Sequence, residues 1–209
     1  MGRERRPAGE ESRFNRRAFL KGSGAAMAAS AWAGTQFDTE AADEPKTYQK
    51  NLISSEAGEV RLTVNGQEYK LMLEPRVTLL DALRNDLKLT GAKEVEETTA
   101  AGADTVLIDG KPVLANSRLA VECQGKQITT IEALTGDNAI VQEFVKQDAL
   151  QCGFCIPGFV MALKGLLEQN PNPNEKEIAS ALGGNLCRCG TYANIKASAL
   201  ELARRGGAN

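Results

Sequence analysis

The sequence predicts an α+β fold, in which a small α+β domain at residues 57–132 precedes an all-helical domain at residues 133–209. Up to about residue 132, apolar residues alternate with polar ones, which is the period of a half-buried strand. After Glu132 the apolar residues recur every three or four positions, which is the period of a helix with one buried face. Pairs of Asn, Asp, Gly and Pro separate these segments and indicate turns between them.

The first domain begins with a predicted β-hairpin. Asn65-Gly66 is a dipeptide typical of a two-residue hairpin turn, and apolar residues alternate with polar ones on both sides of it. Thr78 is placed to cap a short helix whose leucines share one face, and Asp109-Gly110 indicates a second turn. The predicted elements are strands at 60–64 and 69–73, a short helix at 78–84, and strands at 105–108 and 127–131.

Four helices are predicted in the second domain. Asn170-Pro171-Asn172-Pro173 would end the second helix, and Asn174 with Glu177 has the spacing of a capping box that opens the third. The fourth is predicted from about Tyr192 to Arg205. The expected buried faces are Ile140, Val141, Phe144 and Val145 in the first helix, and Phe159, Val160, Leu163, Leu166 and Leu167 in the second.

The N-terminus has the pattern of a twin-arginine export signal. Arg16-Arg17 is followed by Ala-Phe-Leu-Lys and by a run rich in Gly, Ala and Met that ends in Ala31-Trp32-Ala33. We therefore expect a signal peptide at 1–33 and a periplasmic protein, with a basic disordered tail as the alternative. Residues 34–56 are polar and acidic and are predicted to be a linker. Because twin-arginine export carries proteins that have already folded, it suits a protein whose metal centre is inserted before export.

Composition excludes several classes of function. The 209 residues include 25 Lys and Arg against 27 Asp and Glu, so no basic stripe for nucleic acid is expected. The chain contains no histidine, which excludes C-x-x-C-H attachment of a c-type haem and Rieske ligation. Beyond the signal no stretch is apolar for the roughly 20 residues that a membrane helix needs, so no direct membrane span is expected.

Four of the five cysteines form two tight pairs. Cys152 and Cys155 make a C-x-x-C, Cys187 and Cys189 make a C-x-C, and Cys123 is expected to be a half-buried core thiol in a strand-like segment. Each pair lies at a predicted helix boundary, where backbone N–H groups left over from the helix can donate to thiolates. Their spacing favours iron-sulfur ligation, but a disulfide, a zinc site and a thioredoxin-type pair remain open alternatives.

The two cysteine motifs also carry a family resemblance. Residues 151–158 read QCGFCIPG and residues 184–189 read GNLCRC, and the chain from about 58 to 205 resembles the iron-sulfur small subunit of the molybdenum hydroxylases, of xanthine dehydrogenase and aldehyde oxidoreductase type. The resemblance implies a ferredoxin-like β-grasp domain followed by a four-helix [2Fe-2S]-binding domain. It also implies a large partner subunit that holds the molybdopterin cofactor. The implied ligands of one [2Fe-2S] cluster are Cys152, Cys155, Cys187 and Cys189.

The chain departs from this family in its first domain. Family members normally bind a second [2Fe-2S] cluster there, through four cysteines. In this chain the corresponding positions hold Glu96, Ala101, Asp104 and, at the fourth, about Asn116. Since these side chains replace all four thiolates, we expect the second cluster to be absent, while a ligand or docking role for the polar three is left open. A smaller departure is the order Gly190-Thr191, which reverses the family's usual Thr-Gly.

The resemblance implies an electron-transfer subunit that is not catalytic on its own. Electrons from the molybdopterin subunit would pass through the one cluster to an external acceptor, with a cytochrome c as the first expectation and a flavin subunit as the second. The alternative is a structural or docking subunit, in which the single cluster, or a zinc ion, serves folding rather than electron transfer.

Overall fold

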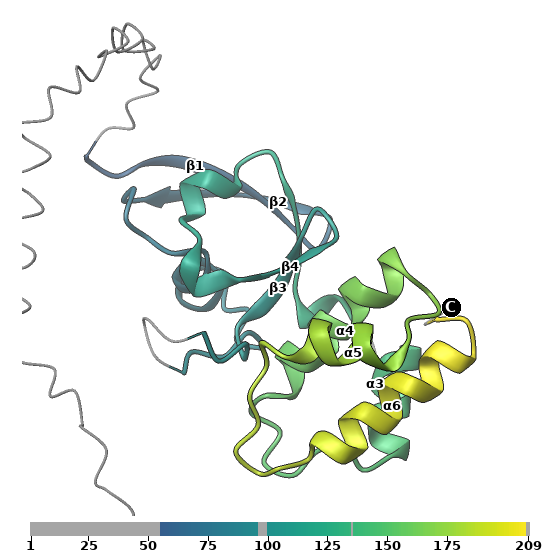
Figure 1. The fold of residues 1–209 in the computed structure, drawn as a ribbon. Helices are drawn as coiled ribbons and strands as arrows, with labels where there is room; N and C mark the ends of the chain where they lie inside the picture. Colours follow the sequence, from purple (N-terminus) through teal and green to yellow (C-terminus); the bar gives the residue numbers. More distant parts are fainter. Residues whose placement is uncertain (1–54, 96–99, 135, 208–209) are drawn as a thin grey trace, which may run out of the picture. The chain divides into compact units, whose positions relative to one another are not determined.

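The computed structural model describes residues 55–95, 100–134 and 136–207 (Figure 1). The predicted signal at 1–33 and nearly all of the predicted linker at 34–56 lie outside these residues. The described chain forms a mixed five-stranded sheet, followed by four α-helices of at least eight residues each. The α+β class predicted from the sequence is therefore confirmed. No helix within the described residues has the length and apolar character needed to cross a bilayer.

The sheet begins with the predicted hairpin. Strands β1 (Gly58–Val64) and β2 (Gln67–Leu73) pair antiparallel around Asn65 and Gly66. Both turn residues have positive φ, +52° and +80°, as a two-residue turn that matches the strand twist requires. The strand order is β2-β1-β5-β3-β4, and only the pairing of β1 with β5 (Gln127–Thr129) is parallel.

Strand β4 (Lys111–Leu114) was not predicted. It pairs antiparallel with β3 (Thr105–Ile108) across the Asp109-Gly110 turn, with Pro112 opposite Leu107. Proline lacks an N–H donor, which argues against a central strand but is compatible with the edge position that β4 occupies. The predicted strand at 127–131 is shorter than expected, because the chain turns into a 3₁₀ helix at Ile131–Ala133.

The short helix after β2 is confirmed. The Thr78 hydroxyl accepts a hydrogen bond from Asp81 N at 3.1 Å and caps α2 (Leu79–Asp81), which continues into a π-helical turn at Ala82–Asp86. The leucines of this segment are buried with the apolar side chains of the sheet. This first cluster of buried apolar residues extends from Val60 to Ile128 along the chain.

The four helices are α3 (Ala139–Lys146), α4 (Ile156–Gln169), α5 (Glu175–Leu182) and α6 (Tyr192–Arg204), and they enclose a second apolar cluster (Figure 1). The predicted capping box at the start of α5 is confirmed by reciprocal hydrogen bonds of Asn174 and Glu177. Helix α4 also packs on β3 and β4, so the helical part contacts the sheet through this helix.

Two sequence expectations about burial are wrong. Val145 is 62% exposed, and the buried face of α3 instead includes Glu143 at 2%, because the helical period places residue 143 rather than 145 toward the α6 side. Cys123 lies in a 3₁₀ turn (Ala120–Cys123) rather than a strand, and its thiol is fully rather than half buried. Its role as a core thiol is otherwise as expected.

Candidate metal centre

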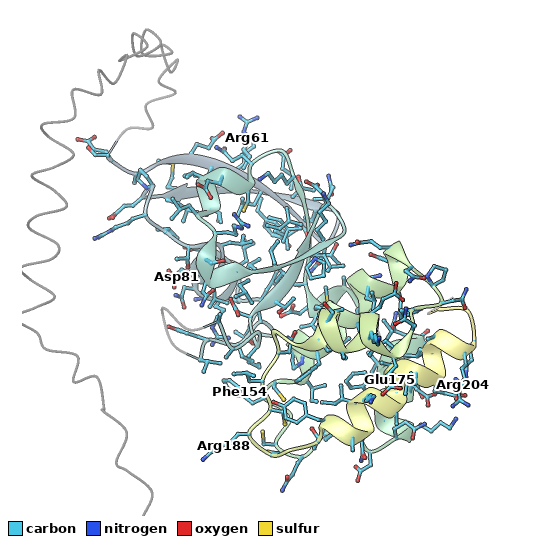
Figure 2. All side chains as sticks on the ribbon, in the orientation of Figure 1. Arg61, Asp81, Phe154, Glu175, Arg188 and Arg204 are labelled. Atoms are coloured by element: carbon cyan, nitrogen blue, oxygen red, sulfur yellow. The ribbon has the colours of Figure 1, made fainter. Side chains whose placement is uncertain are left out.

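The two cysteine pairs lie on two interhelical segments. Cys155 immediately precedes α4, and Cys152 lies three residues before Cys155. Cys187 and Cys189 lie between α5 and α6. Figure 2 labels Phe154 and Arg188, one from each cysteine motif, at the same end of the helices. The prediction that each cysteine pair lies next to a helix end therefore agrees with the structure.

The four thiols meet two by two. Cys155 and Cys187 are buried, 7% and 9% exposed, and they lie close enough for each to shift the pKa of the other. Cys152 and Cys189 are exposed, and they lie close enough for Cys152 to shift the pKa of Cys189. Within the described residues, no three or more His, Cys, Asp or Glu side chains are arranged to hold a single metal ion. None of the cysteines forms a disulfide.

The surroundings of Cys187 favour its thiolate. Burial alone would raise its pKa, but hydrogen bonds from the Thr191 hydroxyl, the Thr191 amide, the Cys155 thiol and the Gly190 amide lower the pKa of Cys187 to about 7. The Thr191 hydroxyl lies 3.3 Å from the Cys187 sulfur. Donors aimed at this sulfur stabilise the negative charge that a ligated thiolate carries.

The partner thiols respond in the opposite direction. Burial and donation to Cys187 raise the pKa of Cys155 to about 12. A backbone hydrogen bond from Cys152 lowers the pKa of Cys189, but donation to the Cys152 thiol, partial desolvation and the neighbouring sulfur charges raise it overall. Four thiolates this close repel one another, so this arrangement is stabilised when cations neutralise the sulfurs.

This donor set fits a binuclear iron-sulfur cluster. Such a cluster takes two thiolates on each of two irons, and the chain supplies two pairs, Cys155 with Cys187 and Cys152 with Cys189. Gly153 and Gly190, each beside a cysteine, have φ of +81°, a conformation that glycine adopts without strain. Soft sulfur ligands without histidine or carboxylate suit iron-sulfur chemistry.

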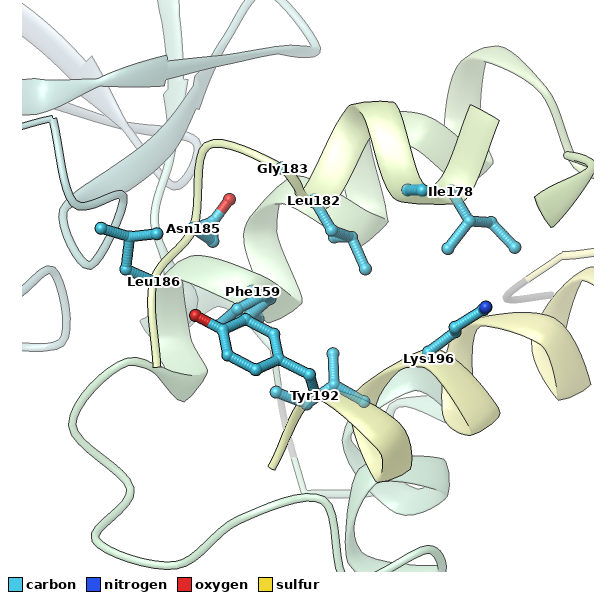
Figure 3. A pocket seen from close by; sticks show the side chains of 10 residues that line it. Phe159, Ile178, Leu182, Gly183, Asn185, Leu186, Tyr192 and Lys196 are labelled. Carbon is cyan, nitrogen blue, oxygen red and sulfur yellow. The ribbon is translucent and has the colours of Figure 1, made fainter. Parts of the chain in front are cut away.

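An apolar pocket of about 260 Å³ lies beside the Cys187 segment (Figure 3). Tyr192 at its edge accepts a hydrogen bond from Cys187 N at 2.7 Å and packs edge-to-face on Phe159, with ring centroids 6.1 Å apart. The Tyr192 hydroxyl therefore holds the backbone of Cys187, one of the implied cluster ligands. The lining residues drawn in Figure 3 include Ile178, Leu182, Asn185, Leu186 and Lys196.

The positions at which family members bind a second cluster do not have the side chains to hold one in the described part of this chain. Glu96 lies outside the described residues. The Asp104 carboxylate is buried and accepts a hydrogen bond from Asn116 N at 2.8 Å, and the Ala101 carbonyl accepts from Leu186 N at 2.9 Å. Ala101 has no ligand atom in its side chain, and this part of the sheet offers no thiolate to iron.

Sequence reasoning missed three residues that contact the cysteine segments. The Thr191 hydroxyl hydrogen-bonds to the Cys187 sulfur, and the Tyr192 hydroxyl accepts from the Cys187 amide. The Asn185 side chain donates to the Gly102 carbonyl in the loop before β3. Asn185 belongs to the GNLCRC motif and Thr191 to the Gly190-Thr191 departure, but neither observation indicated what the side chain contacts. Their roles depend on contacts across the fold, which spacing alone does not reveal.

Comparisons with known proteins identify the family of the chain. Residues 130–200 match the family described as a [2Fe-2S] binding domain. The chain is 44% identical over 150 residues to the nicotine 6-hydroxylase small subunit of Paenarthrobacter nicotinovorans, covering 70% of this chain and 90% of the relative. It is 39% identical over 142 residues to the nicotinate dehydrogenase small FeS subunit of Eubacterium barkeri, covering 66% and 90% respectively.

Among solved structures, quinoline 2-oxidoreductase from Pseudomonas putida 86 contains a chain that is 39% identical to this one. The match has a TM-score of 0.66 and covers 73% of this chain and 99% of that one. The chain therefore belongs to the iron-sulfur small subunits of the molybdenum hydroxylases, the family that its two cysteine motifs resemble.

Proposed function

We propose that this chain holds one [2Fe-2S] cluster through Cys152, Cys155, Cys187 and Cys189 and serves as the electron relay of an exported molybdenum-dependent oxidoreductase. The placing of two pairs of thiols on the segments before α4 and between α5 and α6, close enough to shift one another's pKa, carries the proposal, because a binuclear centre takes four thiolates. The cluster, when bound, accepts and releases one electron at a time. The chain itself makes and breaks no substrate bond.

The residues around the cysteines perform the supporting tasks. Cys155 and Cys187 lie in the apolar core of the helices, which excludes water from one side of the site. Thr191 and Gly190 donate hydrogen bonds to the Cys187 sulfur, and such donors raise the reduction potential of an iron-sulfur centre. Cys152 and Cys189 are exposed, so the other side of the site is accessible to a partner.

The proposed electron donor is a large subunit that binds the molybdopterin cofactor, and the relatives' names as small subunits support a partner of this kind. The proposed acceptor is a cytochrome c or, second, a flavin subunit. Because the positions of an outer cluster hold Ala101 and Asp104, the acceptor would take electrons from the one cluster directly. We also propose a division into a β-grasp domain at 57–132 and a helical domain at 133–209, supported by the two apolar clusters.

Export is proposed from the sequence alone. Replacing Arg16 and Arg17 by lysine is expected to leave the protein in the cytoplasmic fraction, as the twin-arginine signal requires both. If the double variant reached the periplasm at the wild-type level, the signal assignment would be wrong.

A redox titration separates the relay from a purely structural cluster. We expect the EPR signal of the reduced chain to appear and disappear reversibly with one-electron dependence, within the range of about −700 to +450 mV that iron-sulfur clusters span. A centre that stays EPR-silent at every potential, or a chain that contains zinc in place of iron, would favour the alternative role in folding or docking.

A further inference from the structure

Residues 101–105, which precede and enter β3, contact both segments that carry the buried cysteines. They adjoin Asn185 and Leu186, directly before Cys187, and they adjoin Gly158, three residues after Cys155. This stretch, called here the clamp segment, contains two of the positions at which family members hold an outer cluster. It supplies no thiolate, yet it lies against the site of the one cluster that the chain is proposed to bind.

Hydrogen bonds join the clamp segment to the Cys187 side. Leu186 N donates to the Ala101 carbonyl at 2.9 Å, and the Asn185 side-chain amide donates to the Gly102 carbonyl at 2.8 Å. The Thr105 hydroxyl donates to the same Gly102 carbonyl at 2.7 Å and lies 3.4 Å from the Asn185 amide. Asn185 and Thr105 are 5% and 6% exposed, so water cannot readily replace these bonds.

On the Cys155 side the contact is a close approach of backbones. A Cβ built on Gly158 would lie 2.0 Å from the Gly102 carbonyl oxygen. A Cβ on Gly102, where φ is +78°, would lie 2.6 Å from the Asn185 amide nitrogen. Both positions therefore require glycine, and the Gly102 carbonyl lies between α4 and the segment that leads to Cys187.

These contacts fix the two cysteine segments relative to each other through a third piece of chain. We propose that the clamp segment positions Cys155 and Cys187 for the cluster, with Asn185 as its positioning residue. The inference rests on the proposed function for what the cysteines bind, but the contacts themselves concern only the chain. It gives the sheet a task at the metal centre although the sheet provides no ligand.

The test is a set of substitutions in the full chain. Gly158→Ala inserts a methyl group against the Gly102 carbonyl, and Asn185→Asp keeps the shape of the side chain but removes the donated hydrogen bond. The matched control is Gly165→Ala, two turns further along α4, where a Cβ would lie 2.5 Å from Pro112 on β4. It strains the contact of α4 with the sheet without touching the clamp segment. Asn170→Ala serves as the asparagine control.

The first readout is loss of iron to excess chelator, together with the g-values of the reduced cluster. For Asn185→Asp we expect about ten-fold faster loss, the factor that corresponds to one buried hydrogen bond. For Gly158→Ala, which forces the two backbones apart, we expect loss at least as fast, and both variants should alter the EPR signal. The two controls should show wild-type rates and signals even where their melting temperatures fall. If Gly158→Ala and Gly165→Ala lost iron equally fast for an equal drop in melting temperature, the clamp segment would have no positioning role.

A second readout needs no cluster and keeps the two proposals apart. Cluster-free protein is alkylated with iodoacetamide, and labelling of the buried Cys155 and Cys187 is followed by mass spectrometry. The thiols should label faster in Gly158→Ala than in Gly165→Ala, and equal rates would overturn the clamp. Wild-type protein that binds no iron would refute the proposed function, while the labelling comparison would still decide the inference drawn from the clamp segment.

Discussion

Asp104 directly precedes β3, and its carboxylate is buried at 4% exposure and accepts a hydrogen bond there. It accepts from Asn116 N at 2.8 Å, while its backbone carbonyl accepts from Ala115 N at 3.3 Å. Asp104 and Asn116, which stand at two of the positions where family members hold cluster ligands, are thus joined by a hydrogen bond. These polar contacts hold the loop in place.

Replacing Asp104 by alanine should destabilise the fold. The change removes a hydrogen bond to a buried, charged acceptor, which contributes about 1.5–3 kcal/mol to the free energy of unfolding. Urea denaturation followed by circular dichroism measures the loss. The exposed Asp86→Ala serves as the control and should stay within about 0.5 kcal/mol of wild type. If Asp104→Ala also changed the free energy of unfolding by less than about 0.5 kcal/mol, the buried carboxylate would not stabilise the loop.

At the scale of single residues, the sequence was informative where a motif is local. The cysteine pairs and Thr78 as an N-cap could be predicted, because their partners lie within a few positions along the chain. Asn185 could not, since its partner Gly102 is 83 residues away. Contacts of that range depend on how the sheet and the helices pack.

Among the elements, α3 and α6 are joined by a buried carboxylate. Glu143 on α3 is 2% exposed, and Arg205 at the end of α6 lies 3.0 Å from its carboxylate oxygen. The Gln147 side chain donates a further hydrogen bond to Glu143 at 2.7 Å. A buried charge is tolerated only with partners of this kind, so the α3–α6 contact depends on Arg205.

Removing Arg205 is expected to cost more than removing its neighbour. Arg205→Ala leaves the buried Glu143 carboxylate without its guanidinium and should lower the free energy of unfolding by about 1.5–3 kcal/mol. Arg204 pairs with Glu201 at the surface, and Arg204→Ala should change stability by less than about 1 kcal/mol. Thermal and urea unfolding of both variants check the difference. Equal effects would show that the buried pair contributes no more than a surface one.

Helices and strands with clear local signals were predictable from the sequence. The Asn65-Gly66 hairpin and the Asn174 capping box follow from local turn and cap chemistry. Strand β4 was missed because Pro112 argues against a strand unless the edge position is known. The burial of Glu143 was missed because hydrophobic periodicity assigns a charged residue to the surface, and its partner Arg205 lies on another helix.

Across the whole molecule, large exposed apolar side chains gather on the two cysteine segments. Leu150 and Phe154 lie before α4, and Leu186 and Tyr192 flank the second pair, each 40–58% exposed. Exposed apolar residues around a proposed electron-transfer site are typical of a surface that a partner covers. We expect the molybdopterin subunit to dock there.

A charge on this surface should weaken that docking. Phe154→Glu is expected to reduce the affinity for the large subunit by about 2 kcal/mol or more, the size typical of an aromatic hot spot. The control is Met72→Glu on β2, which is 69% exposed and far from the cysteines in sequence. Co-purification of the large subunit with each variant, at equal iron content, gives the comparison. Full retention of the partner by Phe154→Glu would place the interface elsewhere.

The central claim is that the four paired cysteines hold a single binuclear cluster. The most direct test measures iron and acid-labile sulfide per chain, with EPR of the dithionite-reduced protein, for wild type, Cys187→Ser and the control Cys123→Ser. We expect about two irons and one rhombic S = 1/2 signal, lost in Cys187→Ser and kept in Cys123→Ser. Four irons with two distinct signals, zinc, or a signal that survives Cys187→Ser would contradict it.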